Sequence, residues 1–209
     1  MILRRRTKHP HPPKFLPTST RHLALTGGIG AGKSAALAAF ARHGVPTISS
    51  DEIVHGLLRS DPHVLAELRE RFGGDVVGED GADRAKIGAI VFNDRNELDW
   101  LETLLHPRVV EANYAWRAEL EQRAHPPVLS VTEVPLLYET RGERRFDAVV
   151  VVTAPEHVRR ERRPVPDDRE GRLIPDAEKV ARADYAYVND GTLQELDAFV
   201  AEVVAKLSG

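Results

Sequence analysis

Residues 27–34 have the composition and spacing of a loop that binds the phosphates of a nucleotide. Gly27 and Gly32 bracket four residues and are followed by Lys33 and Ser34, which satisfies the pattern G-x-x-x-x-G-K-[S/T]. In such a loop, backbone N–H groups point at phosphate oxygens, and the next helix directs its positive end toward them. A glycine-rich turn without a ligand is the alternative, but the motif is complete. We therefore predict a nucleoside triphosphate site formed by Gly28, Ile29, Gly30, Ala31, Gly32, Lys33, Ser34 and Ala35.

Two acidic residues lie where strands of the expected sheet end. Asp51 follows an apolar segment at 45–49, and Glu133 lies near the end of another at 128–134. Because ligands of open α/β sheets bind at the carboxyl ends of the strands, Asp51 is expected beside the phosphate loop. Asp51 could accept a proton from an attacking hydroxyl or hold a water on Mg²⁺, and Glu133 could order Mg²⁺ bound to Ser34. Asp51 also suits a helix N-cap, and Glu133 could be a solvated acid.

An arginine-rich segment follows the fourth expected strand. Arginines at 159, 160, 162, 163, 169 and 172 are interspersed with prolines at 164 and 166. Such a segment suits a lid over about residues 156–178 whose cations neutralise transferring phosphates, and a solvated charged helix is the alternative. We favour the lid because the segment accompanies a complete phosphate loop. Lys33, Arg163 and Arg172 are candidate catalytic residues, and Asp51 is a fourth candidate whose alternative role is the helix N-cap.

The surrounding pattern predicts an α/β fold with a five-stranded parallel sheet flanked by helices. Strands are expected over 23–26, 45–49, 128–134, 147–153 and 185–188, and the unbroken valines at 149–152 indicate burial on both faces. Helices are expected over 33–43, 52–59, 62–72, 84–92, 97–105, 108–124, 178–183 and 193–207. The predicted helix 33–43 ends at Gly44, and a turn is expected at 78–81.

Composition restricts the classes of protein to which the chain can belong. A length of 209 residues suits one domain with an inserted subdomain, and a net charge of −3 argues against a dedicated nucleic-acid binder. The absence of cysteine excludes disulfides and thiolate chemistry, and no apolar run reaches the ~18 residues that span a bilayer. We therefore expect a cytoplasmic protein without membrane or nucleic-acid partners. Residues 1–21 are basic and proline-rich, and we interpret them as a tail rather than as an arm for an anionic partner.

Several further motifs together resemble the dephospho-CoA kinase family, in the family's order and over about residues 23 to 205. The succession of His-Pro, Pro-Leu-Leu-aromatic-Glu and Ala-Asp…Asn-x-Gly is specific, whereas many NTPases share the phosphate loop. The matching segments are Leu25 to Ser34, Ser50-Asp51-Glu52-Ile53, Asp83-Arg84 through Phe92, Leu101-Glu102 with His106-Pro107-Arg108-Val109, Val134-Pro135-Leu136-Leu137-Tyr138-Glu139, and Ala183-Asp184 through Asn189-Asp190-Gly191.

The resemblance implies ATP- and Mg²⁺-dependent phosphorylation of the ribose 3′-hydroxyl of dephospho-CoA, the last step of coenzyme A synthesis. It implies that Asp51 activates the acceptor hydroxyl and that Asn189 and Gly191 lie near the adenine of ATP. It places the acceptor pocket at His106 and at Pro135, Leu136, Leu137 and Glu139. The kinase domain would cover 22–209, with a helical acceptor subdomain at about 54–125. A monomer or weak homo-oligomer is expected.

Three features of the sequence depart from the family's pattern. Ser49 replaces the first acid of Asp-Ala-Asp, Glu133 stands where many members carry Asp, and the lid is several residues short. Two other hypotheses therefore stay open. One is another P-loop small-molecule kinase, such as a nucleoside monophosphate kinase, and the other is a lid-impaired relative that binds nucleotide without turnover. A regulatory GTPase is disfavoured because the chain has no Asn-Lys-x-Asp.

Overall fold

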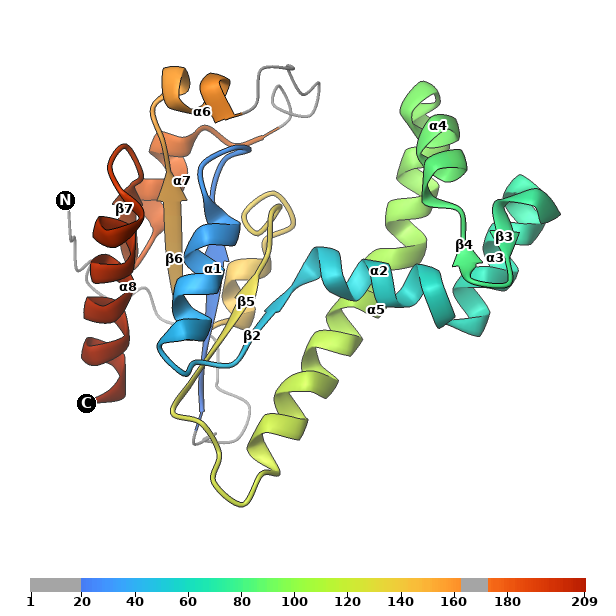
Figure 1. Ribbon diagram of the computed structural model, residues 1–209. Coiled ribbons are helices and arrows are strands. Elements are labelled where there is room, and N and C mark those ends of the chain that lie inside the picture. The colour runs from blue at the N-terminus through green and yellow to red at the C-terminus, as the bar shows by residue number, and fades with distance from the viewer. Residues whose placement is uncertain (1–19, 163–172) are drawn as a thin grey trace. The chain divides into compact units, whose positions relative to one another are not determined.

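The computed structural model describes residues 20–162 and 173–209 (Figure 1). The predictions for the basic tail, Arg163 and Arg172 therefore concern residues outside the described part of the chain, apart from Thr20 and Arg21. The chain forms two compact units. The sheet unit consists of Met1–Ile48 and Arg117–Gly209, and the helical unit consists of Ser49–Trp116. None of the described helices is long and apolar enough to cross a membrane.

The helical unit is built from four helices and a small hairpin. Its elements are α2 (Ser50–Ser60), α3 (Pro62–Phe72), the 3₁₀ helix η1 (Gly74–Val76), strands β3 (Val77–Gly78) and β4 (Gly81–Ala82), α4 (Arg84–Asn93) and α5 (Arg95–Glu121), whose last residues belong to the sheet unit. The expected turn at 78–81 is confirmed as the connection of the antiparallel strands β3 and β4.

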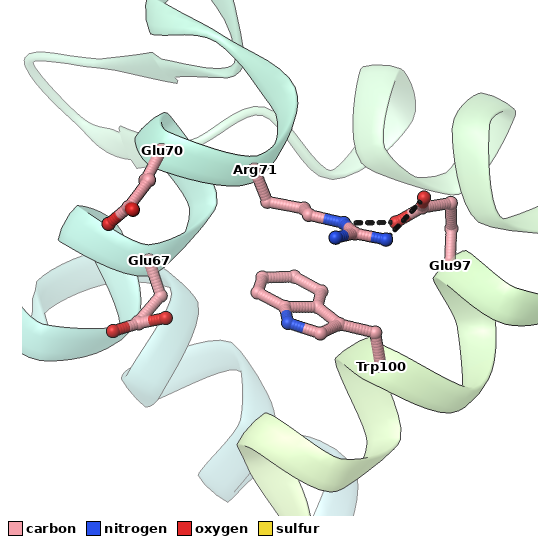
Figure 2. A pocket seen from close by; sticks show the side chains of 5 residues that line it. All are labelled: Glu67, Glu70, Arg71, Glu97 and Trp100. Carbon is pink, nitrogen blue, oxygen red and sulfur yellow. Dashed lines mark hydrogen bonds and ion pairs between the residues drawn. The ribbon is translucent and has the colours of Figure 1, made fainter.

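Aromatic and ionic contacts join α3 to α5 within this unit. Trp100 meets the Phe72 ring edge-on at 5.3 Å between centroids, and the Arg71 guanidinium lies 5.6 Å from the centre of the Trp100 ring. Figure 2 shows Arg71 donating two hydrogen bonds of 2.8 Å to the Glu97 carboxylate. These contacts attach α3 to α5 at the edge of the unit's apolar core.

The prediction of two helices separated at His106-Pro107 is wrong, because α5 runs through Pro107 without ending. A proline inside a helix removes one backbone donor and crowds the preceding turn. Here the Arg108 guanidinium donates a 2.9 Å hydrogen bond to the Leu104 carbonyl in that turn. Leu101, Leu104 and Leu105 are also buried in the unit's core, so packing stabilises the helix on the N-terminal side of the proline.

The sheet unit confirms the predicted fold class. Its five strands are β1 (Arg21–Thr26), β2 (Thr47–Ser49), β5 (Leu129–Glu133), β6 (Ala148–Thr153) and β7 (Tyr185–Val188), in the order β2-β5-β1-β6-β7. β1 pairs in parallel with β5 and β6, and β6 pairs in parallel with β7. The interior position of β6, between β1 and β7, explains its run of valines, because both of its faces are covered.

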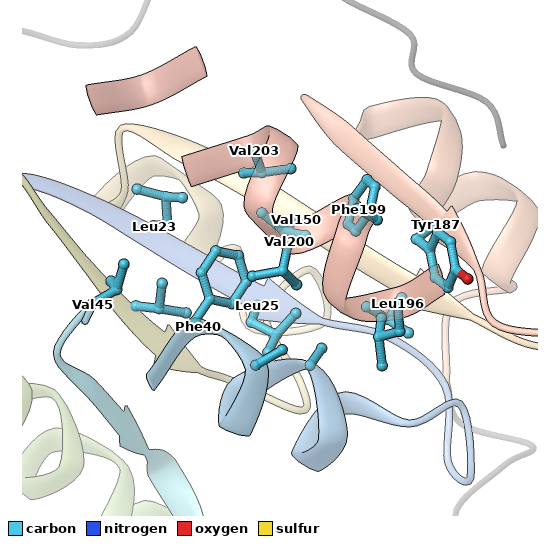
Figure 3. Close-up of a cluster of buried hydrophobic side chains, with 14 of the residues drawn as sticks. Leu23, Leu25, Phe40, Val45, Val150, Tyr187, Leu196, Phe199, Val200 and Val203 are labelled. Atoms are coloured by element: carbon cyan, nitrogen blue, oxygen red, sulfur yellow. The ribbon is translucent and has the colours of Figure 1, made fainter. Parts of the chain in front are cut away.

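Helices cover the sheet on both faces. Residues of α1 (Lys33–Arg42) and α8 (Leu193–Ser208) pack on one face, and residues of α7 (Asp176–Arg182) pack on the other. The unit also contains α6 (Glu156–Arg162), which buries none of its residues, and the 3₁₀ helix η2 (Gly142–Arg145). Because side chains alternate along a strand, Leu23 and Leu25 pack with Phe40 of α1 and Phe199 of α8 (Figure 3), whereas Ala24 belongs to a separate cluster. Strand β1 is thereby packed on both faces where it leads into the phosphate loop.

The ends of these elements differ little from the predicted ends. Helix α1 ends at Arg42 with His43 as its C-cap, so Gly44, predicted as the cap, is the following residue and has a φ of 76°. Strand β2 is shorter than predicted, and α7 begins at Asp176 rather than Glu178.

Candidate active site

The phosphate loop connects β1 to α1 and leaves the start of that helix open. Gly32 is the N-cap of α1 with a φ of 101°, and within the described residues it provides no side-chain cap for the first turn. A glycine at this position leaves room for a phosphate at the helix N-terminus, where backbone N–H groups point outward. The Lys33 ammonium donates a 3.1 Å hydrogen bond to the Gly28 carbonyl, so it lies back across the loop.

Asn189 contacts the second half of the phosphate loop. Its buried side-chain amide donates a 2.9 Å hydrogen bond to the Ala31 carbonyl. A Cβ at position 32 would overlap the same amide, so the contact requires glycine there. Asn189 thus lies at the loop, whereas Gly191 lies beside Glu195, in the capping box of α8.

Arg162 also contacts the phosphate loop, although the sequence did not single it out. Its Nη1 lies 3.4 Å from the carbonyl oxygens of Gly30 and Ala31, and its Nη2 donates to the Asn189 carbonyl at 3.3 Å. The sequence signal was the cluster of arginines in 159–163, but spacing within a charged run does not reveal which member faces the loop.

Glu133 is buried at the end of β5. It stands opposite Leu25 of β1 in the parallel register, one residue before the chain of β1 reaches Thr26 and the loop. The alternative of a solvated acid is therefore wrong. Among the described residues no group of three histidines or acids could hold a metal. The oxygen donors predicted at the loop, Ser34 and Glu133, still fit Mg²⁺, because Mg²⁺ commonly takes one or two protein oxygens together with phosphates and water.

The segment predicted to form part of the acceptor pocket turns partly inward. Leu137 is fully buried, and Glu139 accepts a 3.0 Å hydrogen bond from the Ile174 N–H. The Glu139 carboxylate also lies 2.9 Å from the ammonium of Lys179, which is completely buried. Pro135 is half-buried and Leu136 is exposed. Pro135 and Leu136 are therefore the members of this segment best placed to meet a ligand.

Ser49, not Asp51, caps helix α2. The Ser49 hydroxyl accepts from the Asp51 N–H at 3.1 Å, and the Glu52 carboxylate accepts from the Ser49 N–H at 3.2 Å. Asp51 is exposed, and among the described residues no donor binds its carboxylate. The N-cap alternative for Asp51 is thus wrong, and its carboxylate is left available for chemistry.

Two hollows lie within the helical unit. One, of about 440 Å³, is lined by Glu67, Glu70, Arg71, Glu97 and Trp100 (Figure 2). Its three carboxylates make it unsuited to phosphates. The other, of about 470 Å³, is lined by Glu52, His55, Gly56, Leu58, Arg59, Asp80, Ala82 and Arg84.

The second hollow carries cations that are free for a ligand. Within the part of the chain that the structure describes, neither Arg59 nor Arg84 forms an ion pair. His106, predicted in the acceptor pocket, is exposed on α5 and does not line this hollow.

Comparisons with known proteins agree on one family. The family model described as Dephospho-CoA kinase matches residues 21–195. A dephospho-CoA kinase of Thermobifida fusca is 38% identical over 194 residues, covering 88% of this chain and 95% of the relative. One from Mesorhizobium japonicum is 39% identical over 196 residues, covering 90% and 96%. A crystal structure of a Thermus thermophilus protein is 29% identical with a TM-score of 0.72, covering 91% of this chain and 99% of that one.

Proposed function

The chain belongs to the dephospho-CoA kinase family, and from this premise we propose how its residues carry out the reaction. The enzyme transfers the γ-phosphoryl group of ATP to the ribose 3′-hydroxyl of dephospho-CoA, which gives coenzyme A and ADP. The observation that carries the proposal is the uncapped start of α1 behind a complete phosphate loop.

On the ATP side, backbone N–H groups of residues 28–34 bind the β- and γ-phosphates. Lys33 leaves the Gly28 carbonyl for the phosphate oxygens, because a phosphate attracts an ammonium more strongly than a neutral carbonyl does. We propose that Mg²⁺ is held by Ser34 and the phosphates, with Glu133 ordering its ligands, and that it neutralises charge on the phosphates. Asn189 and Arg162 contact the Ala31 carbonyl and so hold the loop in the conformation that binds the phosphates.

On the acceptor side, Asp51 is proposed to orient or deprotonate the ribose hydroxyl. Its carboxylate is exposed, and Ser49 performs the capping role that would otherwise occupy it. His106, Pro135, Leu136, Leu137 and Glu139 stay predicted acceptor residues. The exposure of His106 and Leu136 supports such a role, whereas the contacts of Glu139 favour a positioning role for that carboxylate.

The hollow beside α2 is proposed to receive the diphosphate of dephospho-CoA. His55 lies four residues after Asp51 and Arg59 eight, so the three side chains follow one side of the helix, at a rise of about 1.5 Å per residue. When the ribose hydroxyl of dephospho-CoA lies at Asp51, the diphosphate of the same molecule would be within reach of His55 and Arg59. Arg84 adds a second guanidinium to the same hollow.

The remaining assignments are also proposals. We assign the helical unit to acceptor binding and the segment at 156–178 to the lid, with Arg163 and Arg172 as candidate contacts of the transferred group. A cytoplasmic location and a monomer or weak homo-oligomer stay predictions.

The test is an ATP-consumption assay with and without dephospho-CoA, in which the product is identified by mass. A gain of one phosphate that requires dephospho-CoA and Mg²⁺ is expected. A nucleoside monophosphate offered side by side is expected to remain unchanged. Binding of ATP without transfer to dephospho-CoA would contradict the proposed mechanism.

A further inference from the structure

Three side chains from three elements meet beside the phosphate loop. Asp176, the first residue of α7, accepts a 2.7 Å hydrogen bond from the hydroxyl of Thr153 at the end of β6. The Arg159 Nη1 of α6 lies 3.8 Å from the same carboxylate oxygen, Oδ2. We call Thr153, Asp176 and Arg159 the clasp. All three belong to the sheet unit.

The clasp lies directly against the first half of the phosphate loop. A Cβ built at Gly28 would stand 2.9 Å from Asp176 Oδ1 and 3.1 Å from Arg159 Nη1. A Cβ at Gly30 would stand 3.5 Å from the Cβ of Arg159. The Arg159 side chain therefore runs along the loop, from Gly30 back to Gly28.

Arg159 has fewer partners than its burial demands. Its side chain is only 25% exposed, and among the described residues its buried Nε has no hydrogen-bond partner. Arg160, the next residue, is 78% exposed and pairs with Glu156 on its own helix. A partly desolvated guanidinium interacts more strongly with nearby charge than an exposed one does, because the medium around it screens less.

We propose that the clasp is a positioning group for the phosphates of ATP. Asp176 fixes the Arg159 guanidinium beside Gly28, where its charge favours anions bound at the loop and its bulk restricts the path of the loop from Gly28 to Gly30. Arg159 precedes the stretch 163–172 and Asp176 follows it, so the clasp also joins the two segments that lead into and out of the arginine-rich stretch. The inference rests on the proposed function in taking ATP as the ligand.

The test is the affinity for MgATP, measured by calorimetry on the full chain without acceptor. Asp176→Asn keeps the side chain's size and its contact with Thr153 but removes the charge that holds Arg159. It is expected to weaken MgATP binding about fivefold to tenfold, which corresponds to loss of one charge-assisted contact. The KM for dephospho-CoA should change by less than about twofold, because the clasp belongs to the ATP side. Arg160→Ala, the matched control, is expected to bind ATP as the parent does.

A second variant tests whether the clasp acts as a unit. Arg159→Met removes the guanidinium and keeps much of its apolar length, and Arg159→Lys should restore part of the affinity. The double variant Arg159→Met/Asp176→Asn should bind ATP no more weakly than Arg159→Met alone, because both substitutions remove the same interaction, the one between Arg159 and Asp176. Thermal unfolding of each variant without ligand separates loss of folding from loss of affinity.

Two results would overturn the inference: an unchanged ATP affinity in both single variants, or fully additive losses in the double variant. Each is distinguishable from failure of the proposed function. If the parent chain binds ATP but does not phosphorylate dephospho-CoA, the mechanism fails, while the pattern of ATP affinities still decides on the clasp.

Discussion

The two units hold their predicted site residues in opposite ways. In the sheet unit Lys33, Asn189 and Glu139 are all bonded to other protein groups, and Asn189 is buried. In the helical unit Asp51 and His106 are exposed, and the cations of the hollow beside α2 have no ion-pair partner among the described residues. We infer that the protein holds the predicted site residues of the sheet unit before a ligand binds, whereas those of the helical unit become fixed only when a ligand meets them.

The largest expected effect is on the preorganised side. Lys33→Ala removes the ammonium that meets the outer phosphates, and we expect kcat to fall about 10³-fold or more, as for loss of a main electrostatic stabiliser. Steady-state kinetics checks this, with Lys206→Ala on α8 as the control, since the partner of Lys206 among the described residues is Glu202 of its own helix. A Lys33→Ala enzyme with more than a tenth of the parent kcat would contradict the assigned role.

On the acceptor side Asp51→Asn tests the chemistry of an exposed carboxylate. We expect kcat to fall about 10²- to 10⁴-fold, the usual contribution of a general base, with little change in ATP affinity. Because Ser49 caps α2, the substitution should lower stability only by the loss of one acidic charge in the first turn, about 0.3–1 kcal/mol. Near-normal kcat would show that Asp51 is not the base. Glu67→Gln, a half-buried acid of the helical unit that pairs with His63, is the control.

Lys179→Met sharpens the contrast through stability rather than rate. It leaves the Glu139 carboxylate without its buried cation, and loss of one partner of a buried pair costs about 3 kcal/mol. Denaturant unfolding measures this cost. Adding Glu139→Gln should recover part of it, and Lys206→Met, which breaks an exposed pair, should cost little. Equal losses for both lysines would contradict the idea that the sheet unit depends on this buried pair.

Arg59→Ala tests the hollow beside α2. Loss of one charge-assisted contact predicts an increase in the KM for dephospho-CoA of about tenfold, with the KM for ATP unchanged. Arg69→Ala, an exposed arginine on α3, is the control. If both arginine variants have the parent's KM, the acceptor diphosphate binds elsewhere.

The smallest expected effect concerns pH. Burial lowers the pKa of His22, and the nearby Arg117 charge acts in the same direction. A histidine whose folded-state pKa is depressed stabilises the fold above its unfolded pKa, about 6.5, and this stabilisation is lost as the pH falls from that value through the lower folded-state pKa. We therefore expect a shallower loss of stability between pH 7 and 5 in His22→Gln than in the parent. Exposed His63 in the helical unit provides the control, His63→Gln, which should leave the pH profile unchanged.

What the sequence predicted well was local. The phosphate loop is one contiguous motif, and the five strands are short apolar runs, so both could be located before the structure was known. What it missed depends on residues far apart in the chain. Nothing near Glu139 identifies Lys179 as its partner, and nothing in the arginine run distinguishes Arg159 and Arg162, which face the loop, from Arg160, which does not. The continuity of α5 through Pro107 likewise depends on tertiary packing, which overrides the local preference.

The uncapped start of α1 also affects the folding equilibrium. Gly32 has no side chain with which to satisfy the first N–H groups of the helix, so the unliganded fold lacks a stabilisation that ordinary helices obtain from their own caps. A bound phosphate supplies it, and a ligand at 100 times its Kd stabilises a fold by about 2.7 kcal/mol. Bound ATP thus stabilises the folded state in the way that an N-cap side chain stabilises an ordinary helix. The lifetime of this protein in a cell should therefore rise and fall with the nucleotide supply.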